Sequence, residues 1–175
     1  MCAELGAGRA TLVLRKGGIA EKSRRGFTAA HREFFLFPSH FHERPEDLRH
    51  VAAPNRVAAA VPRQALVELS LHAAVAELAE ITDLEVARAL VPHQSLTLEA
   101  IERRFRYRKP GIAALVLRVH HLATPLAIPN LARYDVCRSW VELPQYLVFE
   151  RAEPVLDDAT FGARLNEIRA VLGTG

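Results

Sequence analysis

The stretch Gln64–Thr82, QALVELSLHAAVAELAEIT, decides the fold, because it fits two kinds of secondary structure. Apolar residues occupy alternate positions from Val67 to Val75, as in a strand with one buried face. Another apolar series has the spacing of a helix, in a segment rich in the helix formers Ala, Leu and Glu: Leu71, Ala74, Leu78 and Ile81. Periodicity alone leaves strand and helix open.

The segments before this stretch predict strands joined by glycine turns. Ala10–Arg15 is β-favouring and ends at Gly17-Gly18, while Glu33–Phe37 has apolar residues on both faces and ends at Pro38. A further strand opens near Ile19, with Lys22–Gly26 as a polar hairpin tip, and a short helix is expected at Arg44–His50.

The segments after it predict capped helices and further strands. Asp83 caps a short helix that reaches Leu90, and Thr97 caps another. Asp157 or Asp158 caps the last helix. Core-facing residues of the two longer helices are Leu98, Ile101, Phe105, Phe161, Leu165, Ile168 and Leu172. Strands are expected at Ile112–Leu122, Ser139–Leu143 and Tyr146–Phe149.

The order of these segments predicts one α+β domain over residues 1–175. Strands, helices, strands and a C-terminal helix do not alternate as they do around a parallel sheet. We therefore expect a mixed or mostly antiparallel sheet with helices to one side.

Composition predicts a cytoplasmic protein without a membrane segment. The N-terminus lacks a charged region followed by an apolar run, so we expect no signal peptide, and no apolar run is long enough to suggest a membrane span. Cys2, at a terminus expected to fray, and Cys137 do not form a disulfide framework. The net charge of +3 permits a polyanionic partner without requiring one.

Arg15-Lys16-Gly17-Gly18 is the sharpest candidate site, since two cations precede two glycines at a strand end. Glycines let the backbone approach an anion closely, so this loop could hold phosphate. An ordinary glycine turn with solvated charges is the alternative. More cations follow nearby in the chain, at Lys22, Arg24, Arg25 and Arg32.

Arg138, Ser139 and Trp140 form a second candidate, in which Trp140 stacks a base or, alternatively, covers a core edge. His42 is a candidate ligand-binding residue and, with His31 and His93, a candidate general base, although no nucleophile pairs with any of them. The histidine and cysteine spacings match no metal motif, so we expect neither metal nor cofactor.

Several segments, read together, resemble an uncharacterised bacterial family, domain of unknown function 1802. They are LVLRKGGIAE at 12–21, EFFLFPSHFH at 33–42, AEITD at 79–83, the neighbourhood of Pro92-His93, LVLRVHHL at 115–122 and CRSWVEL at 137–143. This resemblance also implies a link to restriction or defence systems.

The order of segments from AVAELAEITD to LVLRVHHLATPLAIP is similar to PUA-like domains of the EVE and ASCH type. That resemblance implies that Gln64–Thr82 is a long strand with a bulge near Ala76. It also implies a partly closed barrel with a pocket for RNA or modified bases.

Three functions follow as hypotheses. The first is a nucleic-acid or nucleotide-binding module that uses Arg15, Lys16 and Gly17-Gly18 for phosphate and Trp140 with Arg138 for a base. The second is an accessory protein-interaction domain without catalysis. The third is a nuclease or nucleotide-processing enzyme with a histidine base.

Overall fold

The computed structural model describes residues 1–16, 20–23, 26–29, 31–38, 44–49, 66–134, 140–143 and 151–174. Its helices are α1 (Cys2–Gly6), α2 (Leu84–Ala89), α3 (Leu98–Arg106) and α4 (Asp158–Leu172), with short 3-10 turns η1 (Pro45–Asp47), η2 (Val91–His93) and η3 (Ala132–Tyr134). Its strands are β1 (Leu12–Arg15), β2 (Ala20–Ser23), β3 (Gly26–Ala29), β4 (Glu33–Phe35), β5 (Leu66–Ile81), β6 (Ile112–Pro129) and β7 (Ala152–Pro154).

The described strands form an open antiparallel sheet in the order β1-β6-β5-β4, with β7 also paired to β6. Strands β2 and β3 make a separate hairpin in which Ser23 pairs with Gly26. The α+β class, the antiparallel sheet and the C-terminal helix are confirmed. The partly closed barrel is not seen, since β1 and β4 lie at opposite edges of the sheet.

Strand β5 settles the ambiguity of the deciding stretch and contains the expected bulge. Val75 pairs with Leu117 and Glu77 with Val116, so Ala76 is an extra residue on β5. The odd-numbered residues 71, 73 and 75 therefore share a face of the sheet with the even-numbered Leu78. Without the bulge, odd and even positions would lie on opposite faces. The bulge explains why the apolar series changes period at this point and resembles a helix.

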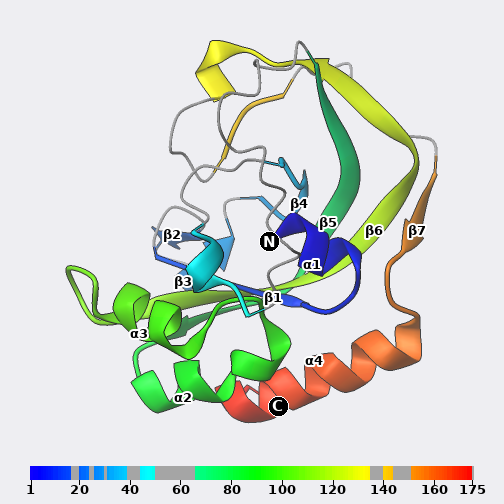
Figure 1. Ribbon diagram of the computed structural model, residues 1–175. Coiled ribbons are helices and arrows are strands. Elements are labelled where there is room, and N and C mark those ends of the chain that lie inside the picture. The colour runs from blue at the N-terminus through cyan, green and yellow to red at the C-terminus, as the bar shows by residue number, and fades with distance from the viewer. Residues whose placement is uncertain are drawn as a thin grey trace.

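The two largest parts of the core lie on opposite faces of the sheet, and a smaller third cluster contains Leu69, Ile128 and Tyr134. One layer packs α2, α3 and α4 against the sheet, and its fully buried side chains include Leu14, Leu90, Ile101 and Ile168. Figure 1 shows these three helices together along one side of the molecule. The other layer joins Leu5 of α1 to Leu71, Leu115 and Leu117.

Capping residues define the helix ends as the sequence predicts. The side chains of Asp83, Thr97 and Asp157 accept hydrogen bonds from backbone N–H groups in the first turns of α2, α3 and α4. The expected stripe on α4 is confirmed: Ile168 is buried, and Phe161, Leu165 and Leu172 pack against the same core.

Several boundaries differ from the expectations. The N-terminus does not fray but forms α1, because Leu5 is buried against the sheet. Arg44–His50 yields only the turn η1 among its described residues, and residues 140–143 are not a strand. Leu98 is exposed instead of facing the core. No helix in the described ranges is long and apolar enough to cross a membrane.

Candidate polyanion-binding site

Three of the eight predicted site residues fall within the described structure: Arg15, Lys16 and Trp140. Gly17, Gly18, His42, Arg138 and Ser139 lie outside the described residues. The roles proposed for those five stay predictions.

Lys16 follows β1 and directs its ammonium group toward the end of α3. Its Nζ donates to the carbonyl oxygens of Phe105 at 3.1 Å and Gly111 at 2.5 Å, and also to that of Lys109. The last carbonyls of a helix have no partner within the helix, and a cation there also complements the helix dipole. Lys16 therefore holds the loop that joins α3 to β6, residues 107–111, against the end of β1.

Trp140 packs at the far edge of the sheet. Its ring meets those of His31 and Phe34 edge to face, with both pairs of centroids 4.9 Å apart. The indole lies half-buried against the core layer that contains α1. Trp140 Nε1 is buried without a hydrogen-bond partner among the described residues.

Arg15 and Lys16 lie at one place on the sheet, and Trp140 lies at another. Arg15 pairs with Ala113, which pairs in turn with Glu80, whereas Phe34 beside Trp140 pairs with Ala73. At about 3.3 Å per residue, and allowing for the bulge, these positions are about 20 Å apart along β5. Trp140 and Lys16 therefore do not line one pocket.

The end of α3 and the loop held by Lys16 together carry more cations than the loop that the sequence singled out. Residues 103–109 read RRFRYRK, with five cations. Arg103 and Arg104 pair with the buried carboxylate of Asp47, at 2.5 and 3.9 Å. Neither Arg108 nor Lys109 forms an ion pair with a described residue, and both are exposed. Two adjacent cations are therefore exposed and have no acidic partner in the part of the chain that the structure describes.

Tyr107 and Arg108 form an exposed stacked pair in this loop. Tyr107 is 56% exposed, and the guanidinium carbon of Arg108 lies 5.1 Å from the centroid of the Tyr107 ring. Arg108 has a φ of 60°, a left-handed conformation that usually falls to glycine or asparagine. Lys16 stabilises the backbone that follows Arg108, because its ammonium group donates to the carbonyl oxygens of Lys109 and Gly111.

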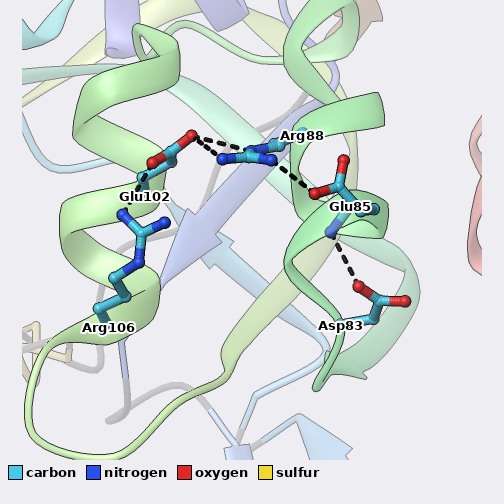
Figure 2. A network of polar contacts seen from close by, with 5 residues as sticks. All are labelled: Asp83, Glu85, Arg88, Glu102 and Arg106. Atoms are coloured by element: carbon cyan, nitrogen blue, oxygen red, sulfur yellow. Dashed lines mark hydrogen bonds and ion pairs between the residues drawn. The ribbon is translucent and has the colours of Figure 1, made fainter.

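A polar network shown in Figure 2 fixes α3 relative to α2. Arg88 on α2 donates to Glu102 on α3 at 2.8 Å and to Glu85 at 2.5 Å, and Arg106 donates to the other oxygen of Glu102 at 2.7 Å. The hydrogen bonds from Arg88 and Arg106 lower the pKa of Glu102. Glu102 therefore stays charged and pairs with Arg106, whereas Arg108 and Lys109 form no ion pair with any residue that the structure describes.

A histidine pair lies elsewhere, on the face of the sheet opposite α1. His72 and His120 are direct cross-strand partners on β5 and β6, with ring centroids 6.3 Å apart. Glu33 Oε2 lies 3.8 Å from His72 Nε2. Burial lowers the pKa of both histidines, and the charge of Arg118 lowers that of His120 further.

Two of the three predicted general bases, His31 and His93, lie within the described residues. His31 packs on Trp140, and His93 Nδ1 lies 4.0 Å from Glu167 Oε2, with its pKa lowered by burial. No group of three or more His, Cys, Asp or Glu side chains within the described ranges is arranged to hold a metal ion.

The patterns in the sequence did not single out Tyr107, Arg108 or Lys109. The available signal was an aromatic residue between cations immediately after a predicted helix. That signal was weak, because a helix C-terminus is commonly basic. The contact between this loop and Lys16 could not be predicted from the sequence, because Lys16 and Lys109 are 93 residues apart in the chain.

Comparison with known families gives one match, which covers residues 1–167 of the 175. Its description is domain of unknown function, DUF1802. No curated protein and no solved structure matches the chain.

Proposed function

We propose that this chain, which belongs to the DUF1802 family, binds nucleic acid through the basic surface formed by the α3–β6 loop and the end of β1. The family description assigns no function, so the proposal rests on the geometry of this chain. The observation that carries it is the adjacent pair Arg108 and Lys109, exposed and without ion pairs among the described residues.

Uncompensated cations are what a phosphate backbone binds. Each contact with a phosphate releases condensed counterions, which makes the affinity depend on salt. Arginine adds a planar group able to contact phosphate with two N–H donors. The neighbouring cations Arg103, Arg104 and Arg106 pair with Asp47 and Glu102, which fixes their side chains and offsets part of their charge.

The loop is also preorganised for binding. Lys16 contacts three carbonyl oxygens around the turn, and Arg88 ties α3 to α2 through Glu102. A loop already held in position loses less conformational entropy on binding. In this proposal the role of Lys16 is to position the loop, and phosphate contact passes to Arg108 and Lys109.

The hairpin of β2 and β3 follows Lys16 closely in the chain. Ala20, the first residue of β2, is four residues after Lys16, so their Cα atoms lie within about 15 Å. Arg15, the last residue of β1, directly precedes Lys16 and adds a cation at this end of the strand. The predicted link to restriction or defence systems would give such a surface a nucleic-acid substrate.

Salt-dependent binding of a labelled oligonucleotide, followed by fluorescence anisotropy, tests the proposal. The wild type should bind more weakly as salt rises, and Lys109→Ala should reduce the slope of log affinity against log salt by about 1. Arg151→Ala is the matched control, since it removes an exposed cation from the residue just before β7, and β7 lies away from the α3–β6 loop (Figure 1).

The control variant should keep the wild-type slope. Absence of binding at low salt would contradict the proposal, and so would an equal loss in Lys109→Ala and Arg151→Ala. Thermal melting of each variant should show an unchanged midpoint, because both side chains are exposed.

A further inference from the structure

We propose that Tyr107 makes this surface selective for single-stranded nucleic acid, by stacking one base on its ring. This inference rests on the proposed function and names the substrate class of the same site. It begins from an unusual exposure: Tyr107 is 56% exposed, beside Phe105, which is 5% exposed in the core. The apolar ring of Tyr107 thus stays in water although a core layer lies two residues away.

The second observation is the arrangement of Arg108 against that ring. The guanidinium carbon lies 5.1 Å from the ring centroid, so a cation and an aromatic face already form a stack. Bases stack on both tyrosine rings and arginine planes. An unpaired base can therefore extend the Tyr107–Arg108 stack, while Lys109 stands next in the chain to meet a phosphate.

The third observation is the backbone that produces the stack. Arg108 has a φ of 60°, which a residue with a side chain adopts at a cost in free energy. Glycine would avoid this cost, yet the position carries a long cationic side chain, folded over its neighbour. An uncommon backbone conformation of this kind is more often retained at binding sites than elsewhere.

Stacking distinguishes single strands from duplexes because a duplex has already stacked its bases on one another. A duplex offers Arg108 and Lys109 its phosphates but offers Tyr107 no base face. A base-free polyanion offers only charge. A ring that stacks a base does not read the sugar, so single-stranded DNA and RNA should both bind.

The test compares three probes: a single-stranded oligonucleotide in DNA and RNA forms, its duplex, and inorganic polyphosphate. Tyr107→Ala should weaken single-strand binding by roughly five- to a hundredfold, with the salt slope unchanged. Duplex and polyphosphate binding should stay at wild-type affinity. Tyr107→Phe, which keeps the ring, should retain single-strand binding.

Arg108→Gly is the second variant, because it removes the guanidinium while keeping a residue that accepts the left-handed backbone. It should weaken binding of all three probes and lower the salt slope. Unchanged single-strand binding in Tyr107→Ala would overturn the inference while leaving the proposed function in place. An equal loss on all three probes in that variant would also overturn it. Failure of the wild type to bind any probe would overturn both.

Discussion

Lys16 contributes three hydrogen bonds to the turn after α3, from its position at the end of β1. The acceptors are the carbonyl oxygens of Phe105, Lys109 and Gly111. The carbonyl oxygen of Phe105 also accepts a hydrogen bond from the backbone N–H of Gly111. Without the ammonium group these carbonyls would lose that donor, although Phe105 would keep the N–H of Gly111. One side chain thus connects the first strand of the sheet to the loop that carries Tyr107, Arg108 and Lys109.

We expect Lys16→Met to lower the free energy of unfolding by about 2 kcal/mol, because the three carbonyl oxygens would lose their charged donor. Hydrogen bonds to charged groups contribute about 1.5–3 kcal/mol to stability. Methionine keeps the unbranched stem and removes only the ammonium. Urea denaturation followed by circular dichroism measures the change. Lys109→Met is the control and should leave stability unchanged; equal midpoints for the two variants would argue against the structural role of Lys16.

At the scale of elements, β5 and β6 bring His72 and His120 face to face. The two residues are in register, so their side chains share a face of the sheet. Glu33 faces His72 from β4, and Arg118 faces His120 from its own strand. Burial is the main reason that the pKa of each imidazole lies below the ordinary value of 6.5.

This pair should make the fold less stable in mild acid. The unfolded chain binds protons at its histidines near pH 6.5, before the folded chain does, so the free energy of unfolding falls as pH drops below that value. Chemical denaturation from pH 8 to pH 5 should reveal this loss. His72→Gln with His120→Gln should flatten the profile.

Glu33→Gln provides the opposite change, because the Glu33 carboxylate favours the charged form of His72. Its removal should lower the pKa of His72 further and steepen the loss of stability in acid. A profile that is the same in the wild type and the double variant would show that the histidine pair does not cause the acid sensitivity.

At the scale of the whole molecule, the two ends of the chain cover opposite faces of the sheet. Leu5 of α1 packs with Leu71 and Leu115, whereas Ile168 of α4 packs with Leu14 and Ile101. Figure 1 shows α4 running beneath the sheet beside α2. Each face is therefore completed by a helix that lies far in sequence from the central strands β5 and β6.

Ile168→Ala should destabilise the protein by about 3 kcal/mol, because Ile168 is fully buried and its loss leaves a cavity among three helices and the sheet. Asn166→Ala is the matched control on the exposed side of α4 and should change stability by less than about 0.5 kcal/mol. Guanidinium denaturation compares the two. Similar losses in both variants would contradict the role of Ile168 in core packing, because alanine has a higher helix propensity than either residue it replaces.

Local signals in the sequence determined most of the elements. Asp83, Thr97 and Asp157 marked helix starts because capping involves only residues within one turn. The spacing of Phe161, Leu165, Ile168 and Leu172 predicted the buried side of α4 for the same reason. Resemblance, and not periodicity, predicted β5 as a strand, since a bulge at Ala76 shifts the apolar positions and imitates helical spacing.

Tertiary structure alone decided which candidate residues lie together. Arg15, Lys16 and Trp140 entered one hypothesis, yet strand register places Trp140 about 20 Å from the basic residues along β5. Conversely, Lys16 meets Lys109 across 93 residues of chain, which brings Tyr107, Arg108 and Lys109 into the site. Caps and periodicities depend on neighbours in sequence, whereas the composition of a surface depends on contacts between distant segments.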